Sequence, residues 1–145
     1  MSSERVCAGN VSSAIEDYLR AMLTLAGANG TTTVRALAEK RAISCPSVSQ
    51  MVRRLISLDL VRHDHYGSIA LTASGAEAAE RLHRRYQLME SYLVVTLGYS
   101  PTAVAVEVDR IEHAVSPRLL ERMAERLATS AIPDGIGDMW AAPSA

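Results

Sequence analysis

The sequence predicts a mainly α-helical protein with one small β-hairpin in its amino-terminal half. Three observations lead to this fold class. Apolar residues recur every three or four positions through most of the 145 residues, which is the period of amphipathic helices. Serine or threonine, often followed by proline, stands where these periodic stretches begin, as helix caps and first-turn residues do. Two strand-like runs, at 60–64 and 68–71, flank a turn that contains Gly67, which is typical of a hairpin.

Three helices are expected before the hairpin, over about 13–26, 34–41 and 46–57. Ser12 or Ser13 is the N-cap of the first, because either can accept a hydrogen bond from a free backbone N–H group. The threonines at 31–33 offer a cap for the second helix. Ser44 caps the third, which has Pro46 in its first turn, where proline is tolerated.

The third helix separates apolar from polar side chains. Its inward positions are Val48, Met51, Val52 and Leu55, and its outward positions are Ser47, Ser49, Gln50, Arg53 and Arg54. A short helix, a tight turn, a helix with a polar outer face and then a hairpin follow the plan of a winged helix-turn-helix domain. In that plan the third helix enters the major groove of DNA. Residues 31–65 carry six basic side chains against three acidic ones, which suits a polyanion.

We therefore predict a DNA-binding surface in this half of the chain. The expected contact residues are Arg35, Pro46, Ser47, Ser49, Gln50, Arg53 and Arg54. The arginines are expected to hold phosphates, whereas the serines, the glutamine and the proline are expected to meet base edges. A helical pair also occurs in purely structural roles, but that role leaves the outward serine, glutamine and arginine side chains unexplained.

The carboxy-terminal half is expected to be entirely helical. Thr72 caps a long helix over 73–97, and Ser100 and Ser116, each followed by proline, begin two more helices. The apolar face of the long helix consists of Leu82, Tyr86, Met89, Leu93 and Leu97. A small amino-terminal domain cannot cover so long a face. We expect it to pack against the two following helices and against the same helix of a second copy.

Asp109, Glu112 and His113 form a second cluster of polar residues. Their spacing of i, i+3 and i+4 makes them neighbours on a helix surface, beside the apolar stripe of Val104 and Val108. Two carboxylates and an imidazole next to a buried seam favour a cation among them, and a divalent metal is the sharpest hypothesis. A solvated polar flank is the alternative, because all three residue types are common on surfaces.

The composition excludes several classes of protein. With 48% hydrophobic and 21% charged residues, and no apolar run that could span a bilayer, the chain is expected to be a cytoplasmic protein that does not bind a membrane. Cys7 and Cys45 are expected to be reduced thiols. There is no His-Glu-x-x-His pair, no Ser/His/Asp constellation and no glycine-rich phosphate loop, so neither an enzyme nor a small-molecule substrate is expected.

Four segments, in order, resemble the diphtheria toxin repressor family of metal-dependent regulators. They are Glu16-Asp17-Tyr18-Leu19, Pro46-Ser47-Val48-Ser49-Gln50, Leu71-Thr72 through Gly75, and Glu112-His113-Ala114-Val115-Ser116. The resemblance covers about residues 13–127. It implies a winged helix-turn-helix domain over 1–72, followed by a helical dimerisation and metal-binding domain over 73–145.

In that family metal bridges the first and fifth helices, so the resemblance nominates as ligands Asp17, Asp109, Glu112 and His113. The oxygen-rich set without a thiolate suits Mn²⁺ or Fe²⁺, and it looks closest to the two-domain manganese transport regulator branch. Tyr86 stands where the family has a metal-binding histidine, and Arg20 where manganese sensors often have a second carboxylate. We therefore expect one metal site per chain. Whether Tyr86, His83 or Glu90 joins it is left open.

The function implied is a homodimeric transcriptional repressor with Mn²⁺ or Fe²⁺ as corepressor. It is expected to bind a near-palindromic operator in double-stranded DNA and to control genes of metal homeostasis. The first alternative is a winged-helix regulator that has lost its metal response. The remote alternative is a metalloenzyme built on the same ligands.

Overall fold

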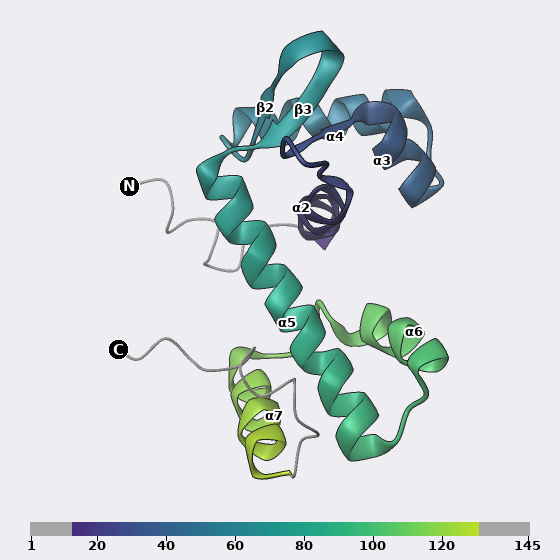
Figure 1. The fold of residues 1–145 in the computed structure, drawn as a ribbon, viewed down its shortest axis with the longest axis vertical. Coiled ribbons are helices and arrows are strands. Elements are labelled where there is room, and N and C mark those ends of the chain that lie inside the picture. Colours follow the sequence, from purple (N-terminus) through teal and green to yellow (C-terminus); the bar gives the residue numbers. More distant parts are fainter. Residues whose placement is uncertain (1–12, 131–145) are drawn as a thin grey trace. The chain divides into compact units, whose positions relative to one another are not determined.

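The computed structural model describes residues 13–130, which form six α-helices and one three-stranded sheet (Figure 1). The chain divides into two compact units between His83 and Arg84. The expected cap at Ser12 and the expected reduced thiol of Cys7 lie outside the described residues. Among the described helices, none is long and apolar enough to cross a membrane.

The helices of the first unit begin within one residue of where the sequence predicts. They are α2 (Ser13–Leu25), α3 (Val34–Arg41) and α4 (Cys45–Ser57). Thr33 caps α3, because its hydroxyl accepts a hydrogen bond from the N–H of Ala36 at 3.1 Å. Ser44 caps α4 in the same way, and Pro46 lies in the first turn of α4. The caps satisfy N–H groups that a helix start leaves without an intrahelical partner.

The core of the first unit is aliphatic, with one tyrosine. Its fully buried side chains are Ile15, Leu19, Met22, Leu37, Val48, Leu55, Leu60, Val61 and Ile69. Of the inward positions predicted for α4, Val48, Val52 and Leu55 are buried, and Met51 is partly buried and packs against the same cluster. The helical period therefore identified the packed face of α4 correctly.

The sheet has one strand more than the predicted hairpin. Its strands β1 (Thr31–Thr33), β2 (Val61–His63) and β3 (Ser68–Leu71) lie in the order β1-β3-β2, and both pairs are antiparallel. Thr32 pairs with Ile69, and Arg62 pairs with Ala70. The expectation of a two-stranded hairpin was incomplete, because β1 contains only three residues and its partner strand lies more than thirty positions away in sequence.

A close backbone contact joins the hairpin to α5 (Ala73–Leu97). The N–H of Thr72 donates to the carbonyl of Leu60 at 3.0 Å, and the Thr72 hydroxyl donates to the carbonyl of Asp59 at 2.6 Å. The same hydroxyl accepts from the N–H of Gly75 at 3.0 Å, which confirms Thr72 as the cap. A Cβ added at Gly75 would lie 1.9 Å from the carbonyl oxygen of Leu60, so only glycine fits there.

The second unit packs α6 (Pro101–Ile111) and α7 (Pro117–Thr129) against the carboxy-terminal half of α5 (Figure 1). Ser100 and Ser116 cap the two helices, as predicted. The buried cluster consists of Met89, Leu93, Val104, Val108, Val115 and Met123. Intrachain packing therefore covers much of the apolar face of α5. Its last member, Leu97, remains 58% exposed.

One element ends earlier than expected. The sequence predicted a helix that carries Asp109, Glu112 and His113, but α6 ends at Ile111. Glu112 is its C-cap, with helical backbone angles and an N–H that donates to the carbonyl of Val108, and His113 follows in a turn. The predicted helix was therefore wrong for its last two positions. Ser116 and Pro117 begin α7 only a few residues later, which leaves no room for another helical turn.

Candidate functional site

The exposed side of α4 carries the polar residues predicted to meet DNA. Pro46, Ser47, Gln50, Arg53 and Arg54 are exposed, whereas Ser49 is only partly exposed. The Ser47 hydroxyl shares a hydrogen bond of 2.9 Å with the Ser44 hydroxyl, so it lies at the very start of the helix. The structure thus groups these side chains on one surface, as the helical period required.

Arg35 lies on α3, where its Nε is 3.1 Å from Oε1 of Glu39. Both side chains are highly exposed, 84% for Arg35 and 69% for Glu39. A pair so exposed to water contributes little stability. Arg35 can therefore exchange this carboxylate for another anion, such as a phosphate, at little cost.

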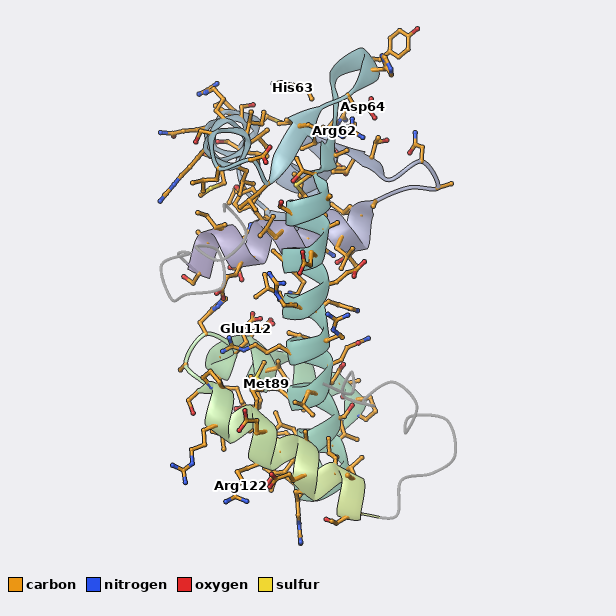
Figure 2. All side chains as sticks on the ribbon, turned by 90° about the vertical axis from the view of Figure 1, so that its left-hand side faces the viewer. Arg62, His63, Asp64, Met89, Glu112 and Arg122 are labelled. Carbon is orange, nitrogen blue, oxygen red and sulfur yellow. The ribbon has the colours of Figure 1, made fainter. Side chains whose placement is uncertain are left out.

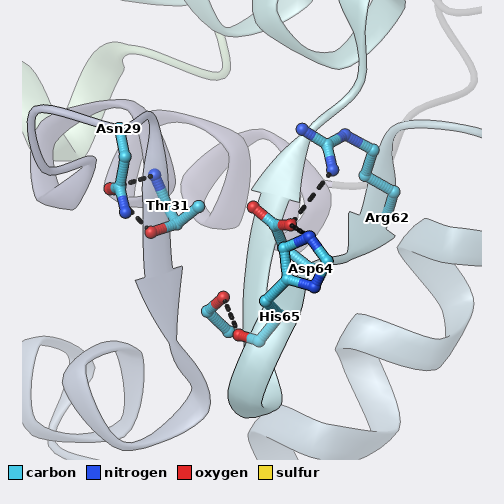
Figure 3. Close-up of polar contacts among 6 residues, drawn as sticks. Asn29, Thr31, Arg62, Asp64 and His65 are labelled. Atoms are coloured by element: carbon cyan, nitrogen blue, oxygen red, sulfur yellow. Dashed lines mark hydrogen bonds and ion pairs between the residues drawn. The ribbon is translucent and has the colours of Figure 1, made fainter.

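The turn of the hairpin contains a fully exposed tyrosine that the sequence analysis did not single out. Tyr66 lies in a short 3-10 turn, η1 (His65–Gly67), with a positive φ of 57°. The neighbouring Asp64 carboxylate is 3.7 Å from Arg62 and 4.0 Å from His65 (Figure 3). The signal in the sequence that could have identified it is an aromatic residue between a histidine and a glycine in the predicted turn of a hairpin.

Within the second unit, the turn after α6 brings two predicted metal ligands together. Nε2 of His113 is 3.7 Å from Oε1 of Glu112, whose side chain is only 12% exposed (Glu112 is labelled in Figure 2). Asp109 lies on the exposed side of α6, three residues before Glu112. Carboxylates and an imidazole are ligands that Mn²⁺ and Fe²⁺ accept. The residues present therefore fit such a metal.

Arg85 of α5 holds this turn in place. Its guanidinium Nη2 donates to the carbonyl of Glu112 at 2.6 Å and to the carbonyl of Val115 at 2.7 Å. The last carbonyls of a helix lack intrahelical partners, so a cation at this position also interacts favourably with the helix dipole. The contacts span 27 and 30 residues, so no local pattern in the sequence points to Arg85. The arginine fixes the backbone between Glu112 and Val115.

Within the first unit, the predicted ligand Asp17 lies on α2 and contacts an arginine. Nη2 of Arg41 is 3.4 Å from Oδ2 of Asp17, and both side chains are 27% exposed. The guanidinium carbon of Arg41 is also 4.7 Å from the centre of the Tyr18 ring, in a cation–π contact. No local pattern in the sequence points to Arg41 as a partner of Asp17, because 24 residues separate the two.

Tyr86, which stands in place of a family histidine, packs against the buried cluster of the second unit. Its ring is partly buried, as expected for an aromatic residue that completes a hydrophobic core. The one described cysteine, Cys45, is exposed at the start of α4, in the first unit. The candidate metal ligands are therefore still carboxylate oxygens and an imidazole nitrogen, as the sequence predicted.

Two features together define a class of protein: a winged helix with a basic, polar recognition helix, and a helical domain in which a carboxylate and an imidazole lie 3.7 Å apart. It is a DNA-binding regulator with a candidate metal centre. Comparison with known families supports this class for both halves of the chain. Residues 10–69 match the iron dependent repressor N-terminal DNA binding domain, and residues 72–132 match the iron dependent repressor metal binding and dimerisation domain. The chain belongs to the iron-dependent repressor family, as the resemblance predicted.

Individual relatives support the same assignment. The chain is 30% identical to the HTH-type transcriptional regulator MntR of Shouchella clausii over 111 residues, which is 77% of each protein. It is also 30% identical to the transcriptional regulator MntR of Escherichia coli O157:H7 over 107 residues, or 74% of this chain and 68% of that one. By name, these relatives are regulators of transcription.

Two solved structures with the same fold are of longer chains. The crystal structure of T. acidophilum IdeR superposes with a TM-score of 0.70 and 28% identity, over 86% of this chain and 58% of that one. A manganese-dependent transcriptional repressor in complex with manganese gives a TM-score of 0.71 and 36% identity, over 78% and 52%. The chain therefore spans about half the length of these structures. They confirm the predicted fold class, a winged helix followed by a helical domain.

Proposed function

We propose that this protein is a cytoplasmic, non-enzymatic transcriptional repressor that binds operator DNA as a homodimer when Mn²⁺ or Fe²⁺ is bound. The metal ligands proposed are Asp17, Asp109, Glu112 and His113. The observation that carries the proposal is the turn after α6, where side-chain atoms of Glu112 and His113 lie 3.7 Å apart. Arg85 holds this turn through the carbonyls of Glu112 and Val115. Membership of a family with a metal-binding and dimerisation domain supports it.

The proposed DNA interface is the exposed side of α4 together with the adjoining basic residues. Ser47, Ser49, Gln50 and Pro46 would face the base edges in the major groove, because the amino-terminal residues of a recognition helix reach them. Phosphates would be held by Arg53, Arg54 and Arg35. Arginine suits this role, because its planar guanidinium donates two parallel hydrogen bonds to a phosphate group.

The proposed dimer buries the apolar residues that the second unit leaves exposed. These are Val95, Leu97, Tyr99, Val106 and Leu119, between 36% and 58% exposed. A symmetric pair of chains would present two recognition helices to two half-sites of DNA, which is why a near-palindromic operator is proposed. Genes of metal homeostasis are the targets that a metal-responsive repressor of this kind would control.

Metal binding would link the two units of one chain, because Asp17 belongs to the first and the other three proposed ligands belong to the second. A bound metal brings its ligand-bearing segments to one fixed separation. It would therefore restrict the position of each recognition helix and favour the spacing that fits the operator. A coupling of about 1–3 kcal/mol is sufficient for such a switch.

Calorimetric titration of chelator-treated protein tests the metal site. We expect one Mn²⁺ or, under anaerobic conditions, one Fe²⁺ per chain, with binding lost in Asp109→Ala. Glu107→Ala is the matched control: it removes another α6 carboxylate, one that pairs with Arg110. In DNA-binding assays, Asp17→Ala should abolish the metal dependence and leave the dimer intact. Metal-dependent DNA binding by Asp17→Ala would contradict the proposed bridge.

A winged-helix regulator without a metal response is the second candidate, and one observation favours it. The proposed ligand Asp17 already has a cationic partner, Arg41, at 3.4 Å. This candidate predicts equally tight operator binding with added Mn²⁺ and with chelator. The proposed repressor instead requires the chelator to weaken binding.

A further inference from the structure

The partner of Asp17 is an arginine at the end of the helix that leads into the helix-turn-helix turn. Arg41 is the last residue of α3, and the turn 42–44 connects it directly to α4. Nη2 of Arg41 lies 3.4 Å from Oδ2 of Asp17. A direct contact therefore joins a proposed metal ligand on α2 to the segment that positions the recognition helix.

The arrangement of Arg41 is more constrained than that of the surface arginines. Its side chain is 27% exposed, compared with 84% for Arg35 on the same helix. Its guanidinium lies 4.7 Å from the ring centre of Tyr18, a residue that is only 4% exposed. Its Nε is buried and has no hydrogen-bond partner among residues 13–130. The Asp17 carboxylate and the Tyr18 ring thus hold the guanidinium in place.

A guanidinium this close to Asp17 weakens the binding of any other cation to the same carboxylate. It neutralises charge that would otherwise attract the metal, and it repels a divalent ion at short range. Both effects are stronger for a half-buried pair than for a fully exposed one, because water screens the half-buried pair less. Arginine is also always protonated at ordinary pH, so the competing charge is permanent.

We propose that Arg41 is a built-in competitor for the metal at Asp17 and sets the metal concentration at which the protein responds. In the metal-free protein, Arg41 neutralises Asp17 and ties the end of α3 to α2. Capture of Asp17 by metal weakens that tie, directly before the turn that leads to α4. The proposal rests on the proposed function, since it assigns Asp17 to the metal site.

The test is the Mn²⁺ affinity of Arg41→Met in the full chain, measured by calorimetry. Methionine keeps much of the side-chain bulk and removes the charge. We expect the affinity to rise at least about tenfold, within the range of ordinary coupling free energies. Lys40→Met is the matched control, because it removes an exposed positive charge from the neighbouring position of α3 and should change the affinity less than about twofold. Arg41→Gln is the second variant in case Arg41→Met folds poorly.

A measurement without metal tests the contact itself. Urea unfolding of chelator-treated wild type, Asp17→Asn, Arg41→Met and the double variant forms a double-mutant cycle. We expect the two substitutions to be non-additive, because each removes the partner of the other. Additive effects would show that the pair does not interact in solution and would overturn the proposal.

The remaining outcomes separate this proposal from the proposed function. If the wild type binds Mn²⁺ and Arg41→Met and Arg41→Gln bind it no more tightly, the competitor role is refuted and the repressor proposal stands. If the wild type does not bind Mn²⁺ but Arg41→Met does, Arg41 suppresses the site and the competitor role is supported. If neither binds Mn²⁺, both proposals fail.

Discussion

Gly75 provides a test in which helix propensity and tertiary packing predict opposite changes in the free energy of unfolding. The residue lies in the first turn of α5, where alanine has the better helix propensity by about 1 kcal/mol. Gly75→Ala would therefore stabilise an isolated helix. In the folded chain, however, the new Cβ would lie 1.9 Å from the carbonyl oxygen of Leu60 and 2.8 Å from its carbonyl carbon. The atoms of Leu60 that approach this Cβ all belong to the backbone, so no flexible side chain can move aside to relieve the contact.

The size of the effect follows from the displacement required. An ordinary contact begins at 3.4 Å, so the start of α5 and residue 60 must separate by about 1.5 Å, which is 3.4 minus 1.9. Overpacking of this kind costs about 1–3 kcal/mol. The same shift disrupts the hydrogen bonds from Thr72 to Leu60 and Asp59, each worth about 1 kcal/mol. After the propensity gain of about 1 kcal/mol is subtracted, we expect Gly75→Ala to lower the free energy of unfolding by about 3 kcal/mol.

Urea unfolding of the metal-free protein, followed by circular dichroism at fixed protein concentration, measures this change. With a urea dependence of about 2 kcal/mol per molar, the midpoint should fall by about 1.5 M. Ser74→Ala, in the same turn but outside the contact, is the control and should shift the free energy by less than about 0.5 kcal/mol. A variant Gly75→Ala as stable as the wild type would refute the close-contact argument.

Two further substitutions test other parts of the first unit. Ala42 closes α3 in the left-handed conformation (φ 54°, ψ 43°), which costs a residue with a Cβ about 1 kcal/mol, so Ala42→Gly should raise the free energy of unfolding by about 0.5–1 kcal/mol. A loss of stability in the same urea assay would show that this strain is absent. Gln50→Ala should weaken operator binding by about 1–3 kcal/mol, measured by fluorescence anisotropy, with little loss on unrelated DNA. An equal loss on both sequences would contradict base readout by Gln50.

The elements predicted correctly are those encoded by neighbouring residues. Ser44, Ser100 and Ser116 cap their helices because each side chain bonds to a backbone N–H three residues later. Val48, Val52 and Leu55 are buried because a helix places them on one face. These relations extend over one or two helical turns, so periodicity and capping residues were sufficient to predict them.

The elements that were missed depend on distant partners. The strand β1 exists because Thr31–Thr33 pair with β3, and three threonines alone are too few to show a strand period. The early end of α6 is accompanied by Arg85, whose guanidinium holds the carbonyls of Glu112 and Val115. Neither relation leaves a pattern in the local sequence.

The sequence by itself determined the fold class, the caps, the packed faces and the residue types of the candidate site. Local steric and hydrogen-bonding preferences carry that information, and relatives with the same arrangement confirm the family. The partners of the charged groups were decided only by the tertiary structure. It places Arg41 against Asp17 and Arg85 against the turn that bears Glu112 and His113. Electrostatic contacts act through space between residues that are far apart in the chain, so periodicity in the sequence does not predict them.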